Sequence, residues 1–454
     1  MADPQQATQI YRAILARTPE NQIDPTLDRV RRALDLLGQP ERTCQVVHVA
    51  GTNGKTSTAR LIEALVRAHG LRTGLFISPH LASPAERILL DGEPISDEAL
   101  IEAWRLVGPV VDMVDTEMAG VSKGKLSFFE VMWLVAAVAM ADAPVDVAVV
   151  EVGLGGRWDA TNTVESQVQV ITPISRDHTE YLGDSIEAIA REKAGIIRSE
   201  VVLGRQSDAA AGVLEAAIDS SGARGHWLGQ DFDVVARELA VGGQLVHLRG
   251  LAWPYEQVFL PLHGAHQADN AACAVAAVEL LLAGAGTGLD SEVLAEALAE
   301  TASPGRLEVV GVAPTVLVDA AHNHAGAEAL AAAIDEAFPF DLIGLVGVLR
   351  GKDAEAILGA LEPVVQRVVV TEAASDRAVP AAELAEVALE VFGPDRVEVV
   401  EYLDEALTRA VELALIDADG SPAPLATGVL ATGSVILAGQ VRTLLGGAPR
   451  HGVS

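Results

Sequence analysis

The chain has 454 residues and a net charge of −31, because 63 Asp and Glu outnumber 32 Lys and Arg. This charge repels nucleic acid and anionic membranes, so we expect neither as a partner. An anionic ligand must therefore meet concentrated cations, for which the candidates are Lys55, Arg157, Lys193 and Arg306. Hydrophobic residues make up 50% of the chain and aromatic residues only 4%. This favours an α/β protein with Ala, Val and Leu in its core, and the length indicates two domains.

The cysteines and the apolar segments bear on where the protein resides. Cys44 and Cys273 match no metal spacing, which indicates reduced core residues of a cytoplasmic protein. The first residues lack the cationic start and apolar run of a signal peptide. The uncharged span 421–441 is about long enough to cross a bilayer, but its Pro, Gly, Thr, Ser and Gln content favours a buried strand, turn and helix. We therefore expect a soluble protein.

The first predicted elements are a strand over 45–49 and a helix over 56–69, with a glycine-containing turn between them. The glycines of this turn let backbone N–H groups face a polyphosphate, Lys55 can reach the terminal phosphates, and Thr56 can hold Mg²⁺. A strict Walker motif has glycine where this chain has Val49, so the match is to a shorter variant. A plain turn with a solvated lysine is the less favoured alternative. The residues expected at the nucleotide are Gly51, Thr52, Asn53, Gly54, Lys55 and Thr56.

Further strands and helices predict a doubly wound N-terminal domain of the P-loop ATPase type. The remaining strands of its mostly parallel sheet are expected at 73–77, 145–152, 168–172 and 201–204. Short runs broken by Gly and Pro between 232 and 260 predict a small antiparallel sheet. Helices are expected at 267–283 and 291–301.

A second, smaller, Rossmann-like α/β domain is predicted after the segment Ser303-Pro-Gly-Arg306, which breaks the helical pattern. Strands separated by alanine-rich helices are expected near 316 and at 342–348, 368–371 and 397–400. We place the domains at 1–302 and 303–454, with a hinge near 303–307.

Three polar side chains follow successive predicted strands of the N-terminal sheet. Ser78 follows the strand 73–77, Glu151 ends the apolar run 145–150, and His178 lies beyond the strand that ends at 172. The carboxyl ends of parallel strands meet at one edge of a sheet, where α/β proteins bind ligands. Taken alone, Ser78 opens a turn before proline, and a lone histidine is more often structural. Together, beside the phosphate loop, they indicate a Mg·ATP site.

The sequence resembles the folylpolyglutamate synthase and dihydrofolate synthase family of the Mur ligase superfamily, and most closely its bifunctional bacterial form. The most specific matches are Glu151-Val-Gly-Leu-Gly-Gly-Arg157 and Glu192-Lys-Ala-Gly-Ile196. The other matching segments span nearly the whole chain and are 23–30, 51–57, 78–81, 158–162, 177–183, 263–270, 303–308, 319–323 and 432–434.

The resemblance implies roles for individual residues. Ser78, Glu151 and His178 would ligate one or two Mg²⁺ ions, Lys193 would carry a carbamate formed from CO₂, and His322 would lie near the reacting phosphate. Without the resemblance, Lys193 is more often a solvated lysine. Further ATP contacts would come from Asn270, Arg306 and Asp319. The pterin side would be met by Ile23, Asp24, Pro25, Ser127, Phe128, Phe129, Glu130, Trp158, Asp159 and Ala160. From the residues alone, the paired phenylalanines more often indicate a core.

The family reaction joins L-glutamate to a carboxylate with ATP, through an acyl phosphate. The acceptor is dihydropteroate, or the terminal γ-carboxylate of a reduced folate, and we expect the enzyme to be a monomer. Trp133, His324 and Gly351 depart from the family pattern and leave a shifted substrate preference open. A cell-wall Mur ligase is a rival, but a loop at residue 51 leaves no room for the N-terminal domain such enzymes generally carry. The other rivals are a paralogous amide ligase, a P-loop phosphotransferase and a nucleotide-gated binding module.

Overall fold

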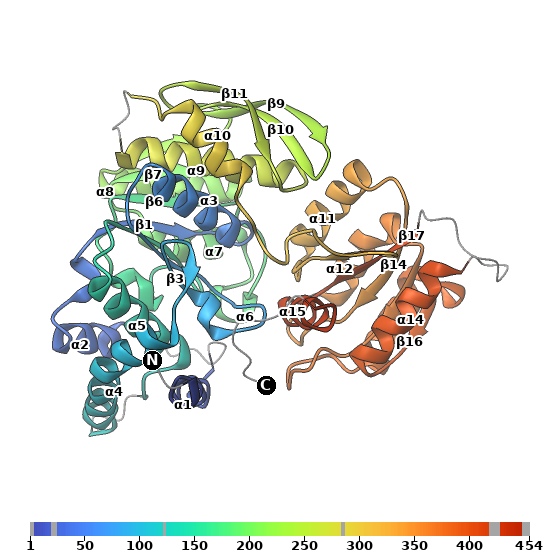
Figure 1. The fold of residues 1–454 in the computed structure, drawn as a ribbon, viewed down its shortest axis with the longest axis horizontal. Coiled ribbons are helices and arrows are strands. Elements are labelled where there is room, and N and C mark those ends of the chain that lie inside the picture. The colour runs from blue at the N-terminus through green and yellow to red at the C-terminus, as the bar shows by residue number, and fades with distance from the viewer. Residues whose placement is uncertain (1–3, 20–24, 121–123, 283–286, 417–426, 447–454) are drawn as a thin grey trace.

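The computed structural model describes residues 4–19, 25–120, 124–282, 287–416 and 427–446. Two bodies stand side by side in Figure 1, one coloured blue to yellow and the other orange to red. The first contains an eight-stranded and a three-stranded sheet, and the second a six-stranded sheet. Within the described ranges, no helix is long and apolar enough to cross a membrane.

The eight-stranded sheet confirms the predicted, mostly parallel N-terminal sheet. Its order is β4-β3-β2-β5-β1-β6-β7-β8, and only β3 and β4 run antiparallel to their neighbours. The strands are β1 (Gln45–Ala50), β2 (Thr73–Phe76), β3 (Ile88–Leu90), β4 (Glu93–Pro94), β5 (Val147–Glu151), β6 (Val168–Ile171), β7 (Glu200–Leu203) and β8 (Arg224–Trp227). The parallel central strands β5, β1 and β6 therefore end at the same edge of the sheet. Glu151 and His178 follow two of these strands, so both are expected at that edge.

Helices cover both faces of this sheet because successive strand side chains alternate in direction. Val47 and Val49 face α3 (Lys55–Ala68), α9 (Ala265–Leu282) and α10 (Ser291–Ala299). Val46 and Phe76 face the other layer, which consists of α1 (Pro4–Leu15), α2 (Asp28–Leu36), α4 (Asp97–Gly120) and α5 (Phe128–Asp142). Beside it lie α6 (Thr179–Leu182), α7 (Ile186–Lys193) and α8 (Asp208–Ser221). Neither α1 nor α2 is among the helices predicted from the sequence.

The small sheet predicted between 232 and 260 is present. It consists of the antiparallel strands β9 (Asp233–Ala240), β10 (Gly243–Arg249) and β11 (Pro254–Leu260), with β10 in the middle. Figure 1 shows it on the outer side of α9, on the far side of the molecule from α1, α2 and α4. Its position leaves β9 and β10 near the C-terminal body.

The C-terminal sheet also agrees with the prediction, with one added strand. Its order is β12-β13-β17-β14-β15-β16, and only β12 is antiparallel. The strands are β12 (Glu308–Val312), β13 (Thr315–Val318), β14 (Asp341–Val346), β15 (Arg367–Val370), β16 (Val397–Val399) and β17 (Thr427–Thr432). One face packs on α11 (His324–Ala337), α12 (Ala354–Leu361) and α13 (Ala381–Phe392), and the other on α14 (Leu403–Leu415) and α15 (Val435–Leu444).

The uncharged span 421–441 contributes a buried strand and a helix to this body, as expected. Its described part forms β17 and the start of α15, and residues 421–426 lie outside the described ranges. Val429, Leu430 and Ala431 are fully buried. The apolar character of the span is therefore explained by burial within the sheet.

Candidate active site

The phosphate loop connects β1 to α3 and depends on two glycines. A Cβ atom at Gly51 would lie 1.8 Å from Oγ1 of Thr172, and one at Gly54 would lie 2.5 Å from Oδ1 of Asn270. The backbone φ angles are +144° at Gly51 and +88° at Gly54. Only glycine fits this combination of backbone conformation and close contact. The loop therefore has a fixed shape, with the N-terminus of α3 behind it.

Replacing Gly54 with alanine is expected to weaken nucleotide binding by at least about tenfold, which corresponds to about 1.4 kcal/mol. The new methyl group would displace Asn270, which packs against the loop. Calorimetric titration with a non-hydrolysable ATP analogue measures the effect. Gly70→Ala is the matched control, because φ is also positive there (+85°) while no described atom lies within 4 Å of the added Cβ. Equal affinities for the two variants would contradict the prediction.

A buried carboxylate lies beside the loop. Thr56 Oγ1 donates to Glu151, 3.0 Å from both carboxylate oxygens, and the Ser78 N–H donates to Glu151 Oε2 at 3.2 Å. Glu151 is 1% exposed, and burial raises its pKa, opposed by the charge of Lys55 and by these hydrogen bonds. Hard oxygen donors of this kind suit Mg²⁺, and a cation would favour the ionised carboxylate. Across the described ranges, no group of three or more His, Cys, Asp and Glu side chains is arranged to hold a metal ion.

Asp177 and His178 occupy the loop after β6. Burial lowers the pKa of His178 to about 3, despite the neighbouring charge of Asp177, so the imidazole is neutral near pH 7. A neutral imidazole is the form that ligates a metal. Burial alone would raise the pKa of Asp177, but its hydrogen bond to His322 and the nearby charge of Lys352 hold it far below the usual range.

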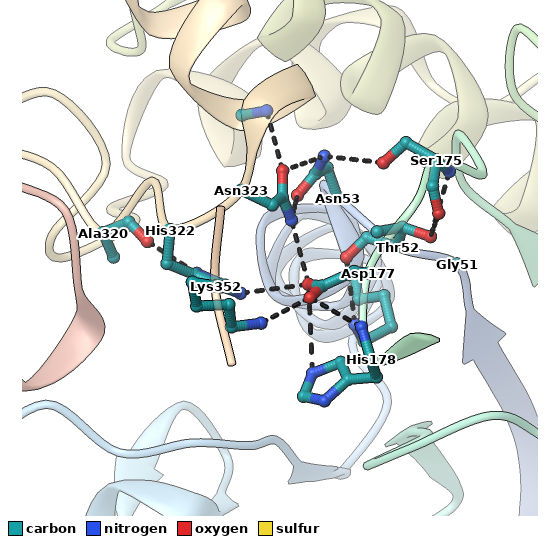
Figure 2. A network of polar contacts seen from close by, with 12 residues as sticks. Gly51, Thr52, Asn53, Ser175, Asp177, His178, Ala320, His322, Asn323 and Lys352 are labelled. Carbon is teal, nitrogen blue, oxygen red and sulfur yellow. Dashed lines mark hydrogen bonds and ion pairs between the residues drawn. The ribbon is translucent and has the colours of Figure 1, made fainter. Parts of the chain in front are cut away.

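Polar contacts join the two bodies at this point, as Figure 2 shows. Asp177 forms ion pairs with Lys352 and with His322 Nε2 at 3.4 Å, and it accepts a hydrogen bond from Asn323 Nδ2 at 3.0 Å. Asn53 and Asn323 exchange amide hydrogen bonds of 3.1 and 3.0 Å. We call these five residues the interdomain clasp. Two of them, Asn53 and His322, are predicted site residues.

Lys193 points from the end of α7 toward the phosphate loop. Its Nζ donates to the Gly51 carbonyl at 2.6 Å, and the side chain is almost fully buried. Burial, and then the charge of Lys55, lowers the pKa of Lys193 to about 7, against Asp177 and Asp159. Lys55 Nζ itself donates to the Thr52 carbonyl at 3.2 Å. Near neutral pH a large fraction of the Lys193 amine is therefore uncharged.

One cavity of about 540 Å³ connects the phosphate loop to the predicted substrate segments. Ser78, His178, Lys193 and the clasp residues Asp177, His322 and Lys352 line one part of it. The lining of the substrate part includes Pro25, Ser127, Phe129, Glu130, Trp158, Asp159 and Ala160. Ile23 and Asp24, which belong to the same prediction, lie outside the described residues. The cavity thus brings together two predicted sites that are far apart in the sequence.

Phe128 and Trp133 are placed differently from Phe129. Phe128 is buried, with the Arg87 guanidinium 4.7 Å from its ring centre, and it does not line the cavity. Trp133 is also in the core, where its Nε1 donates to Thr163 Oγ1 at 3.1 Å and its ring contacts Phe76. Trp133 therefore supports the cavity wall from behind rather than facing a substrate.

The other two departures from the family pattern, His324 and Gly351, lie near the N-terminal ends of α11 and α12. His324 is exposed and contacts Glu328 and the Ala356 carbonyl, outside the cavity lining. Gly351 has a φ of +84°, a conformation that an acidic residue rarely adopts, and it precedes the clasp residue Lys352.

Of the remaining ATP candidates, Arg306 and Asp319 lie at the linker between the bodies, and Asn270 lies at the phosphate loop. Asp319 accepts hydrogen bonds from the backbone N–H groups of Leu307 and Ala321, both at 2.7 Å. Burial raises the pKa of Asp319, and the charge of Arg306 opposes this shift. Asn270, on α9, lies against Gly54. Asn270, Arg306 and Asp319 do not line the 540 Å³ cavity, and their contact with ATP stays a prediction.

The two bodies and the shared phosphate site define a ligase of the Mur type. Residues 99–278 match the model of the Mur ligase middle domain, and residues 305–434 match that of the Mur ligase, glutamate ligase domain. The dihydrofolate synthase/folylpolyglutamate synthase of Mycobacterium tuberculosis is 48% identical, over 97% of this chain and 94% of its own length. The chain belongs to the dihydrofolate synthase/folylpolyglutamate synthase family, which confirms the resemblance.

Solved structures agree with this assignment. The Mycobacterium tuberculosis folylpolyglutamate synthase complexed with ADP is 46% identical and superposes with a TM-score of 0.93, covering 99% of this chain and 100% of the other. The FPGS-AMPPCP-folate complex is 29% identical, with a TM-score of 0.83 and coverage of 97% and 100%. The predicted fold class and the class of ATP-dependent ligase are thereby confirmed.

Proposed function

We propose that this enzyme uses ATP to add L-glutamate to 7,8-dihydropteroate and to the terminal γ-carboxylate of reduced folates. The observation that carries the proposal is the single cavity that connects the phosphate loop to Phe129 and Trp158. The name of the relative from Mycobacterium tuberculosis covers both activities, and the FPGS-AMPPCP-folate complex pairs an ATP analogue with folate.

The reaction has two steps. The acceptor carboxylate attacks the γ-phosphorus of ATP, the bond to ADP breaks, and an acyl phosphate forms. The amine of glutamate then attacks the acyl carbon, loses a proton, and displaces inorganic phosphate to leave an amide. Lys55 would stabilise charge on the transferring phosphoryl group, and closure of the two bodies at the interdomain clasp would keep water away from the acyl phosphate. His322 enters from the C-terminal side beside these groups.

The residues at the end of the sheet suit a magnesium ion. Ser78, Glu151 and His178, together with the Thr56 hydroxyl, would hold one or two Mg²⁺ ions. Bound Mg²⁺ offsets the negative charge of the polyphosphate. The hydrogen bonds between these groups hold Glu151 in a position that faces the phosphate loop.

The environment of Lys193 suits the proposed carbamate. Its neutral amine attacks the carbon of CO₂, forms an N–C bond and releases one proton, which leaves an anionic carbamate. Burial and then the charge of Lys55 lower the pKa of the Lys193 amine, and the same Lys55 charge would stabilise this anion. The modification would thus convert a costly buried cation into an anion beside the magnesium site.

The cavity offers aromatic surfaces for a pterin. Trp158 is 51% exposed, and Phe129 lines the same cavity. Asp159 already accepts hydrogen bonds from the backbone N–H groups of Leu154 and Thr161 at 2.9 and 3.0 Å. Glu130 accepts from Arg29 and from the Ser127 N–H at 3.2 and 2.6 Å. We therefore assign pterin contact mainly to the aromatic faces, with both carboxylates held in fixed positions beside them in the cavity lining.

The finer parts of the assignment follow from the same proposal. Residues 1–302 and 303–454 would act as the two domains, with the hinge at 303–307. The enzyme would work as a cytoplasmic monomer on small molecules, and both cysteines are free thiols in the structure.

Mass spectrometry of reaction products tests the function. Purified enzyme with Mg·ATP and L-glutamate is expected to form a glutamate adduct with 7,8-dihydropteroate in one tube and with a reduced folate in the other. Omission of glutamate is the control, because an amide ligase should then form no adduct. Product only from the folate would restrict the function to tail extension.

Other outcomes identify the rivals. Tight ATP binding without an adduct in either tube, followed by an adduct with another carboxylate in a screen, would indicate the paralogous ligase. Rapid phosphate release that does not depend on glutamate would favour a phosphotransferase, and nucleotide binding without turnover would favour a binding module.

A further inference from the structure

Helix α11 contacts the N-terminal body at both of its ends. At its start, the Asn323 side chain accepts from the Gly326 N–H at 2.8 Å, capping the helix, and also bonds to Asn53 and Asp177. At its other end, Glu336 and Phe338 face the small sheet of β9–β11 and the segment that follows it. The helix has 14 residues, so its ends are about 20 Å apart.

The contacts at the far end form a second joint between the bodies, which we call the distal joint. Arg237 of β9 donates two hydrogen bonds of 2.8 Å to the Glu336 carboxylate, and a third of 3.1 Å to Gln244 Oε1. Gln244 is fully buried, and its amide donates to the carbonyls of Leu262 and Gly264. The Arg237 guanidinium is therefore held in place by β10 before it meets Glu336.

At the distal joint, α11 lies close to the backbone of the N-terminal body. A Cβ atom at Gly264 would lie 2.7 Å from Cβ of Ala333, so α11 rests directly on the chain at Gly264. The ring centres of His263 and Phe338 are 4.9 Å apart, with the rings edge to face. A bidentate ion pair with apolar contacts beside it fixes both the orientation of α11 and its distance from the small sheet.

We infer that Arg237 and Glu336 are positioning residues for the ligase reaction, acting through α11. α11 is packed on the C-terminal sheet, so without the distal joint the C-terminal body can rotate against the N-terminal body and carry the helix with it. A rotation of about 10° displaces a group about 20 Å from the rotation axis by about 3–4 Å. Displacements of that size strongly reduce the rate of a reaction that needs aligned groups. The β9–β11 sheet therefore supports the helix so that Asn323 and His322 meet the phosphate loop. The inference rests on the proposed function only for its activity readout.

Charge reversal tests the inference. Glu336→Arg places two cations together, and kcat for amide formation is expected to fall about tenfold while the Kd for an ATP analogue stays within about twofold. The double variant R237E/E336R restores the pair in the opposite direction and should recover kcat to within about threefold of the wild type. Small-angle X-ray scattering with the ATP analogue should show a larger radius of gyration for the single variant than for the double one. Glu336→Gln, which removes the pair without repulsion, should give a smaller effect of the same kind.

Arg205→Glu is the matched control, because Arg205 pairs with Asp233 and Asp269 within the N-terminal body. Its kcat and radius of gyration should equal those of the wild type. Wild-type kcat in E336R, or a double variant no better than the single ones, would overturn the inference. If the wild type forms no glutamate adduct, the proposed function fails, and scattering alone still decides whether the distal joint holds the domains together.

Discussion

Lys193→Ala and Lys193→Arg are both expected to lower kcat for amide formation to below about one-thousandth of the wild type. Lys193 is buried and contacts the Gly51 carbonyl, so its removal disturbs the phosphate site directly. Arginine retains the positive charge but cannot form a carbamate, so the pair of variants separates the two roles of the lysine. Steady-state assay of the glutamate adduct measures both.

Carbamate formation should also depend on CO₂ and pH. The carbamate requires neutral Lys193, and its pKa of about 7 means that the neutral form increases as the pH rises through 7. Enzyme stripped of CO₂ should therefore regain activity faster at pH 8 than at pH 6 when bicarbonate is added. Carbon-13 NMR with labelled bicarbonate should show a carbamate signal that both variants lack. Substantial activity in Lys193→Arg would rule out the carbamate.

Glu151→Gln is expected to lower kcat/KM by about 10²–10³-fold, because an amide oxygen is a much weaker magnesium ligand than a carboxylate. The fold should be retained, since glutamine keeps the shape and can still accept from Thr56 and from the Ser78 N–H. Burial raises the pKa of Glu151, so loss of the charge should not destabilise the protein. A raised magnesium requirement in the titration of activity is the specific readout.

Glu279→Gln separates this effect from the general loss of a buried carboxylate. Glu279 is fully buried, and it accepts from the Leu251 N–H at 2.6 Å and from the Tyr255 hydroxyl at 2.8 Å, remote from the cavity lining. We expect this variant to be less stable by about 1–2 kcal/mol, with normal activity per folded molecule. Equal activity losses in the two variants would argue against a metal role for Glu151.

The parts of the fold that the sequence predicts well are those with strong local patterns. β1, β5 and β6 are mostly apolar and almost entirely buried, and the alternation of strands and helices specifies parallel sheets. The first two helices have no prediction, although Val30, Ala33 and Leu34 recur at the helical period in α2. The antiparallel strand β12 is also without a prediction, because it is half-exposed and pairs only with β13 at the sheet edge.

The candidate site also contains some neighbours that the sequence predicts and others that it does not. Glu151, Ser78 and the phosphate loop are close in space because parallel strands end at a common edge, a rule that operates on sequence alone. Lys352 lies 175 residues from its partner Asp177, and only the orientation of the two bodies brings them together. The dipeptide Lys352-Asp353 and the pair Asp177-His178 are visible in the sequence, but their contact is not. The same holds for Arg237 and Glu336.

The two-sided construction of the cavity has a consequence for inhibitors. Ser78 and Lys193 enter the cavity from the N-terminal body, and His322 and Lys352 enter from the C-terminal one. A compound that contacts both walls can leave only when the bodies separate, so its dissociation rate is limited by opening of the protein. Two compounds with equal affinity would then differ in residence time according to whether they span the cavity or occupy one wall.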